Sequence, residues 1–375
     1  MRRQRFLAGI SSAGAVYLAF GRRAPAIAGA APSTQPTAGA ASIVRVRLFA
    51  ADRLVGADIS GVHLDASSAP TAVTGQPGPL VVTAHLADGT TIQRRYQGTI
   101  RSSNVDGFLV LANDVDLESY VASVLASEIS SRWHAEALRA QAVAVRTYAV
   151  RRMQRKHASV YDVVDTTANQ VYRGVDGIVA SLSAAGAATA GQCLLYGSDP
   201  ADIWYHSACG GHTAASVEVT GSAAPPYLRG ASDTGPDGRA FCSASPYYSW
   251  RNTLPAEALS RLAGVGNASV TALAVTQRWD DGRARSIRIQ TSDGAERAMD
   301  GHDFYDRAGS VLGYKVVPSA LFDLTASTGG SYIVSGHGVG HGVGMCQYGA
   351  QGRALAGQTA SQILAAYFPG TTVAT

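Results

Sequence analysis

The chain has 375 residues, of which 46% are hydrophobic and 15% are charged, with 41 glycines and four cysteines. This length supports one large domain or two smaller ones with a substantial core. The low charge and high apolar content exclude a disordered protein. Four cysteines in a chain of this length exclude a small disulfide scaffold.

The formal charge of +4 comes from the N-terminus. Residues 1–30 contain five arginines and no acidic residue, so the remaining chain has 26 Lys and Arg against 27 Asp and Glu, a net charge of −1. A nearly neutral protein has no electrostatic basis for binding nucleic acid. We therefore expect no nucleic-acid partner.

Residues 1–30 have the pattern of a secretory signal peptide. A basic start precedes an apolar run over 6–20, and two A-x-A cleavage sites follow it. The run is shorter than the ~20 residues that span a bilayer, which favours cleavage over a membrane anchor. The Arg2-Arg3 pair leaves both the general and the twin-arginine export routes open. We predict an exported protein, periplasmic, wall-associated or extracellular, with no stable membrane span after processing.

The remaining chain predicts an α+β fold. Residues 31–42 are small and proline-containing and are typical of a flexible linker. Residues 43–112 contain alternating and short apolar runs between turn residues, which predicts a β-rich part. Residues 113–375 form a core part, within which a β-rich insertion occupies about 252–330. Strands, helices and further strands in this order favour α+β over a doubly wound sheet.

Three stretches of the core part predict helices. Residues 115–157 repeat apolar residues at helical spacing and are rich in Ala, Gln and Arg. The segments 179–190 and 360–368 have a similar but shorter pattern. Residues 268–324 predict short strands, with turn signals at D-D-G-R and S-D-G-A-E.

Glu128 is the candidate general acid, because it lies between two helical segments with Ala126, Ile129 and Trp133 nearby. Apolar surroundings raise the pKa of a carboxyl group and suit it to donating a proton. A solvated glutamate at a helix end fits the same spacing. Glu118 is the reserve acid, although its place within a helix favours a surface role.

The segment W-Y-H-S-A-C-G-G-H-T predicts either a metal site or a disulfide. His206, Cys209 and His212 are spaced three apart, and Cys242 can complete a four-ligand set. A Cys209–Cys242 disulfide is the alternative in an exported protein, and unpaired thiols are a third. Four protein ligands leave no position for water, so a zinc ion here would be structural.

A glycine-rich segment over 335–352 predicts a binding loop, with a structural turn as the alternative. Glycine recurs at every second position from 336 to 344, which lets the backbone approach a ligand closely. No G-K-[ST] follows, so the segment is not a phosphate-binding loop. His341, Gln347 and Tyr348 offer hydrogen-bonding groups and a stacking surface.

These stretches, in this order, resemble the SpoIID/LytB family of cell-wall proteins. Residues 43–375 carry the resemblance, through N-D-V-D-L-E-S-Y-V-A-S-V-L-A-S-E-I at 113–129, A-L-R-A-Q-A-V-A-V-R-T-Y-A at 137–149, N-Q-V-Y-R-G at 169–174, Y-H-S-A-C-G-G-H-T at 205–213, P-Y-L-R-G at 226–230, G-H-G-V-G-H-G-V-G-M-C-Q-Y-G-A at 336–350 and the terminal I-L-A-A-Y-F-P-G-T. The chain departs from the family pattern at Cys346, where Ser is usual, and at Ile129-Ser130, where Met-Pro is common.

The resemblance implies a lytic transglycosylase that cuts peptidoglycan glycan strands, or an enhancer of a cell-wall amidase. It places the catalytic acid at Glu128 and a zinc ion, found in some members, near His206 and Cys209. The cleavage requires no cofactor. Candidate glycan contacts are Gln141, Arg146, Tyr172, Ser207, His341, Gln347 and Tyr348. His341 has the alternative role of holding the glycine-rich loop, and Arg146 that of packing in a helix.

Two other functions remain open from sequence. The first is a non-catalytic module that binds wall glycan and recruits or activates an amidase. The second is a secreted zinc hydrolase that uses His206, Cys209 and His212 with water.

Overall fold

The computed structural model describes residues 42–75, 78–155 and 160–375. The predicted signal peptide over 1–30, and the predicted linker up to residue 41, lie outside the described residues. Helices and several sheets alternate along the chain, which confirms the α+β class. Among the described residues, no helix combines the length and the hydropathy that crossing a bilayer requires.

The first part of the chain forms two sheets, ordered β4-β7-β8-β1-β9 and β3-β2-β5-β6. Apart from the parallel pair β1 and β9, neighbouring strands are antiparallel. In β1 and β5 every second residue is buried, as the alternating pattern predicts. The bounds are β1 (Ile43–Leu48), β2 (Leu54–Ile59), β3 (Val62–Asp65), β4 (Ala72–Thr74), β5 (Leu80–Leu86), β6 (Thr91–Tyr96), β7 (Thr99–Val105), β8 (Phe108–Asp116) and β9 (Val163–Val164).

Strand β8 runs directly into the helical part. It continues past the predicted end at Ala112, because the buried Asn113 side chain donates to the carbonyl oxygens of Gln97 and Thr99. Asp116 then caps α1 (Leu117–Glu128), since its carboxylate accepts the N–H groups of Glu118 and Ser119.

Helix α2 (Ala135–Arg155) lies at the centre of the helical part. Its residues from Ala137 to Ala149 are almost all buried, so the helix is covered on several sides rather than on one. It packs against α1, α3 (Ala180–Ala188), α7 (Gln347–Leu355) and α8 (Ala360–Tyr367). These helices share one hydrophobic core with the β1–β8 sheets.

The segments that follow α3 form short strands and turns. Strand β12 pairs in parallel with β19 from the end of the glycine-rich segment. The C-terminal β20 pairs with β10, so the chain end returns to the helical part. The bounds are β10 (Cys193–Tyr196), β11 (Asp199–Pro200), β12 (Tyr205–His206), α4 (Ser216–Thr220), η1 (Phe241–Ala244), β19 (Met345–Cys346) and β20 (Thr372–Ala374).

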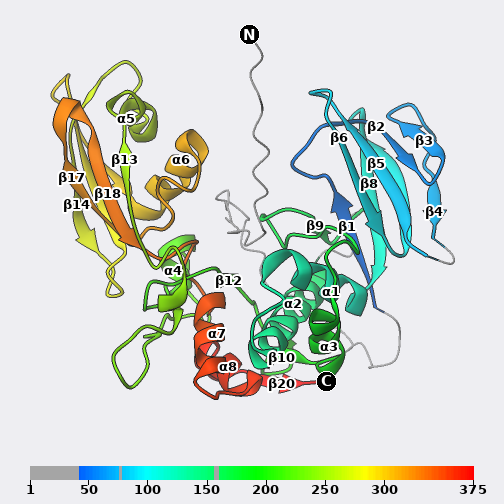
Figure 1. The fold of residues 1–375 in the computed structure, drawn as a ribbon. Coiled ribbons are helices and arrows are strands. Elements are labelled where there is room, and N and C mark those ends of the chain that lie inside the picture. The colour runs from blue at the N-terminus through cyan, green and yellow to red at the C-terminus, as the bar shows by residue number, and fades with distance from the viewer. Residues whose placement is uncertain (1–41, 76–77, 156–159) are drawn as a thin grey trace, which may run out of the picture.

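A second unit has its own hydrophobic core, formed by residues between Leu254 and Val334. In Figure 1 this unit and the β1–β8 sheets stand on opposite sides of the central helices. Its bounds are β13 (Ser249–Leu254), α5 (Ala256–Ala263), β14 (Val270–Arg278), β15 (Ala284–Thr291), β16 (Glu296–Asp300), α6 (Gly301–Leu312), β17 (Phe322–Ala326), η2 (Thr328–Gly330) and β18 (Tyr332–His337).

The prediction of short strands over 268–324 was wrong for α6, which interrupts them. Asp300 caps this helix by accepting the N–H groups of His302 and Asp303. Phe304, Tyr305 and Ala308 are buried on its inner face, at helical spacing. Apolar residues at helical spacing were present in this part of the sequence, but the run was too short to indicate a helix.

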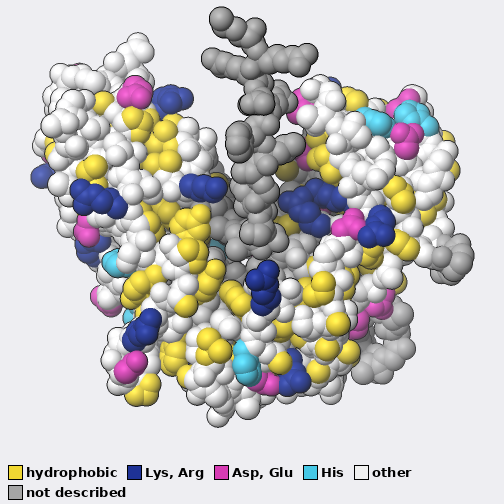
Figure 2. Space-filling model, in the orientation of Figure 1, with side chains coloured by type: hydrophobic (Ala, Val, Ile, Leu, Met, Phe, Trp, Pro, Cys, Tyr) yellow, Lys and Arg dark blue, Asp and Glu magenta, His cyan; other side chains and the backbone are white. Residues whose placement is uncertain are grey.

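Surface charge is mixed. On the face shown in Figure 2, Lys and Arg side chains are scattered among acidic and uncharged ones. This distribution agrees with the nearly neutral composition of the chain after residue 30.

We predict that Gly344→Ala destabilises the fold more than Gly357→Ala. Both glycines have positive φ, 72° and 87°, which costs a substituted residue about 1–3 kcal/mol. A Cβ at 344 would also overlap the carbonyl oxygen of Trp204, whereas a Cβ at 357 meets nothing within 4 Å. The overlap should add about 1–3 kcal/mol to the loss of unfolding free energy at 344. Urea unfolding measures both variants, and equal losses would contradict the close approach at Gly344.

Candidate active site

Glu128 is the last residue of α1, and its side chain is buried, with 6% of the residue exposed. The helix ends there because Ile129 adopts an extended conformation. The Glu128 Oε1 atom accepts the Val171 N–H at 2.7 Å. Its Oε2 atom has no hydrogen-bond partner among the described residues. The solvated helix end that the sequence left open is therefore excluded.

Burial raises the pKa of Glu128 to about 7, against the opposing effects of the Val171 N–H and the Tyr205 hydroxyl. A carboxylate at the C-terminal end of a helix also faces the negative end of the helix dipole. The group is therefore partly protonated at neutral pH, as a general acid must be.

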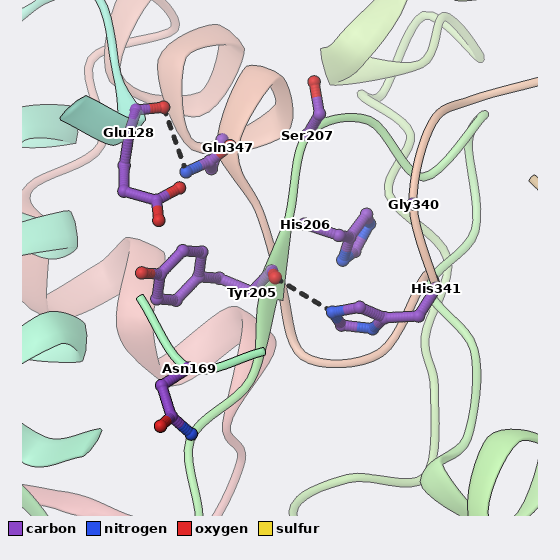
Figure 3. A pocket seen from close by; sticks show the side chains of 8 residues that line it. All are labelled: Glu128, Asn169, Tyr205, His206, Ser207, Gly340, His341 and Gln347. Carbon is purple, nitrogen blue, oxygen red and sulfur yellow. Dashed lines mark hydrogen bonds between the residues drawn. The ribbon is translucent and has the colours of Figure 1, made fainter. Parts of the chain in front are cut away.

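Glu128 lines a pocket with an empty volume of about 290 Å³. Figure 3 shows its carboxyl group between the Gln347 and Tyr205 side chains. The lining residues come from four segments that are distant in the sequence: Glu128, Asn169, Tyr205, His206, Ser207, Gly340, His341 and Gln347. Glu128 is the only carboxylate among these described lining residues.

Parallel pairing of β12 with β19 assembles the pocket wall. It sets His206 beside Cys346, and a bridge between Ala208 and Val339 extends the contact. Gln347 follows directly as the first residue of α7, and its Nε2 lies 3.5 Å from the backbone oxygen of Glu128.

His341 holds the glycine-rich loop against β12. Its Nε2 donates to the Tyr205 carbonyl oxygen at 3.0 Å, and its Nδ1 accepts the Val343 N–H at 3.0 Å. Burial lowers the pKa of His341 well below its usual value, so the ring is neutral. The structure thus gives His341 the loop-holding role, and its ring also forms part of the pocket wall.

His206 presents a hydrogen-bond acceptor to the pocket. Its Nδ1 donates to the Val343 carbonyl oxygen at 3.1 Å, so Nε2 carries the lone pair. This Nε2 is buried and has no partner among the described residues. Burial, helped by the charge of Arg283, lowers the pKa of His206 to about 3, so the ring stays neutral.

Tyr205 and Asn169 were not among the predicted site residues, although both lie in the quoted motifs. The Tyr205 hydroxyl oxygen accepts a hydrogen bond from Gln170 Nε2 at 3.1 Å. The hydroxyl proton of Tyr205 is not used in this bond and can be donated to another group. Asn169 Nδ2 donates to the Tyr148 hydroxyl at 2.8 Å. A second pocket shares Asn169, Tyr205 and His341 with the first, so the two adjoin.

Three predicted glycan contacts lie in the core instead. Arg146 is fully buried and pairs with Glu118, with its Nη2 2.5 Å and its Nε 2.8 Å from the carboxylate. Tyr172 is buried and donates to Asn113 Oδ1 at 2.6 Å. Gln141 is buried within α2 and does not line either pocket. Helical spacing could not reveal this for Gln141 and Arg146, because α2 is covered on several sides.

Tyr348 also lies outside the two pockets. Its ring packs edge-on against Trp133, with the ring centroids 5.0 Å apart. Ser207 and Gln347 are the predicted contacts that line the pocket together with His341.

The predicted four-ligand metal set does not come together. His206 belongs to the pocket, and His212 Nδ1 lies 2.8 Å from the Thr213 carbonyl oxygen. Cys209 and Cys242 do meet, with their sulfur atoms 3.6 Å apart and no disulfide between them. Their neighbours are Cys346 and Asp233, neither of which was predicted as a ligand. A zinc hydrolase built on His206, Cys209 and His212 is not compatible with this arrangement.

Comparisons with known proteins show the family to which the chain belongs. The family model described as stage II sporulation protein (SpoIID) matches residues 106–196, which include Glu128 and α2. An uncharacterized protein of Brachyspira hyodysenteriae is 32% identical over 293 residues, covering 76% of this chain and 74% of the relative. The chain belongs to the SpoIID family.

Two Bacillus subtilis proteins extend the comparison. Stage II sporulation protein D is 29% identical, covering 69% of this chain and 75% of the relative. The amidase enhancer is also 29% identical, covering 67% of this chain but 39% of the relative.

We predict that Glu128→Gln stabilises the protein above neutral pH. The folded carboxyl binds its proton with a pKa of about 7, against 4.5 for the ordinary group. The contribution of Glu128 to folding stability therefore falls as pH rises from about 4.5 to 7. In this range the group ionises readily in the unfolded chain but not in the folded protein. At pH 8 the variant should gain about 3 kcal/mol of unfolding free energy, and near pH 4 almost nothing.

Urea unfolding at the two pH values measures this difference. Glu257→Gln, at an exposed position, is the matched control and should show no pH-dependent gain. An equal response of the two variants would show that the Glu128 carboxyl is solvated.

Proposed function

We propose that the protein is an exported peptidoglycan lytic transglycosylase that cleaves MurNAc–GlcNAc bonds and forms 1,6-anhydro products. The observation that carries the proposal is a single buried carboxyl group, with a pKa of about 7, in a pocket whose lining residues mostly have polar side chains. Family membership supports a role in the cell wall. The N-terminal pattern of residues 1–30 supports export.

The reaction needs only one carboxyl group of the protein. Protonated Glu128 gives its proton to the glycosidic oxygen as the C1–O bond breaks. The resulting carboxylate then takes the proton of the muramic C6 hydroxyl as that oxygen bonds to C1. Glu128 is thereby reprotonated, and the sugar closes into the 1,6-anhydro ring. Hydrolytic glycosidases use a pair of carboxylates, which neither pocket offers among its described lining residues.

Neighbouring polar groups would hold the glycan. His206 Nε2 is an unpartnered acceptor and would accept a sugar hydroxyl. Gln347 and Ser207 add donors on the same wall. The Tyr205 proton can stabilise the Glu128 carboxylate after the first transfer. No cofactor takes part in these steps.

A second candidate function is a glycan-binding enhancer of a cell-wall amidase. The similarity to the Bacillus subtilis amidase enhancer favours it. Under this function the protein would bind glycan strands and an amidase without cutting the strands.

Glu128→Gln should abolish anhydro products. The amide retains the shape of the side chain but has no proton to give, which typically costs about 10²–10⁴-fold in rate. Mass spectrometry of glycan strands without stem peptides, incubated with wild type, Glu128→Gln or Glu257→Gln, measures the products. Wall binding with no anhydro product from wild type would support the enhancer instead, and reducing-end products would indicate hydrolysis.

The rate of anhydro-product formation should fall as pH rises through about 7, because Glu128 loses the proton that it must donate. The loss should approach about tenfold for each pH unit above that value. Initial rates between pH 5 and about 9, with binding to the strands followed in parallel, test this. A rate that stays constant up to pH 9 would argue against Glu128 as the acid.

A further inference from the structure

We propose that Cys209, Cys242, Cys346 and Asp233 form a closed zinc site that holds the wall of the pocket together. All four residues are buried, and one potential ligand atom from each lies within 4.8 Å of the others. The sequence indicated Cys209 and Cys242 as ligands but not Asp233 or Cys346, which the fold brings beside them. The inference concerns structure and metal content, so it does not depend on the proposed transglycosylase activity.

The distances suit a tetrahedral ion. Bonds of about 2.3 Å from zinc to sulfur place two sulfur ligands about 3.8 Å apart. The Cys209 and Cys242 sulfurs are 3.6 Å apart, and Cys209 Sγ lies 3.2 Å from Asp233 Oδ2. An ion at the centre would replace the direct contacts between these atoms.

Backbone N–H groups point at the sulfur atoms. Cys346 Sγ accepts the N–H groups of Cys209 and Gly349, each at 3.2 Å. Cys209 Sγ accepts the Gly211 N–H at 3.3 Å. Cys346 also caps α7, so its sulfur lies at the positive end of a helix dipole. These donors favour thiolates, which are the form that binds metal.

Asp233 is oriented by an outer layer of partners. Its Oδ1 accepts from the Tyr367 hydroxyl at 2.8 Å and from Arg353 Nε at 3.0 Å. Its Oδ2 is thereby turned toward the sulfur atoms. Fixing a ligand through its second oxygen is typical of metal-binding carboxylates.

Three sulfurs and one carboxylate oxygen select zinc over magnesium or calcium, which prefer oxygen ligands. Four protein ligands leave no open position for water, so the ion would be structural. A Cys209–Cys242 disulfide would use two of these sulfurs and would not account for Cys346 Sγ and Asp233 Oδ2 lying beside them.

The site would act on the pocket through chain connectivity. Cys209 follows Ser207 by two residues, and Cys346 directly precedes Gln347. Both neighbours line the pocket. An ion bound to the two cysteines would therefore fix the relative position of the segments that β12 and β19 bring together.

Elemental analysis of the full chain, purified without chelators, tests the proposal. We expect about one zinc ion per chain in wild type, and at least about a tenfold loss in Cys346→Ser and Asp233→Asn. Cys193→Ser, outside the cluster, and His212→Ala should retain the metal. Zinc lost from His212→Ala but kept in Cys346→Ser would overturn the proposed ligand set.

Wild-type protein provides a second test that no folding defect can obscure. A thiol reagent should label Cys193 and leave the three clustered cysteines unlabelled until a chelator is added. Replacement of zinc by cobalt should give the absorption of a tetrahedral thiolate complex. Absence of metal together with a Cys209–Cys242 disulfide, found by peptide mapping without reduction, would overturn the proposal.

Discussion

The parallel pairing of β12 with β19 is the contact on which the rest of the site depends. It requires a glycine at 344, where any side chain would meet the Trp204 carbonyl oxygen. His206 of β12 lines the pocket that contains Glu128, and Cys346 of β19 belongs to the cluster of three cysteines and Asp233. One short backbone contact therefore sets the geometry of both.

His206 and Cys209 belong to different sites, although they are only three residues apart. The His206 ring lines the pocket, whereas the Cys209 sulfur lies with Cys242, Cys346 and Asp233. Strand β12 ends at His206 and the chain bends at Ser207, between the two residues. The spacing that suggests a shared metal site in the sequence therefore does not bring the two side chains together in the structure.

Burial of Glu128 reduces the stability of the fold, and other contacts of α1 offset this loss. A carboxyl group held away from water at the end of a helix opposes folding whenever it is ionised. The position of α1 is fixed by the Asp116 cap at its start and by the ion pair between Glu118 and the buried Arg146. Glu118, the reserve candidate for the acid, therefore anchors the helix that contains Glu128.

The sequence by itself determined the α+β class, the alternation of β1 and the helices around Glu128. These features are local, because they depend on residue periods and on apolar neighbours. The sequence did not show that Arg146 and Tyr172 belong to the core, that Tyr205 and Asn169 line the pocket, or that Cys346 and Asp233 join Cys209. Only the tertiary structure decided these points, because each depends on contacts between segments tens to hundreds of residues apart.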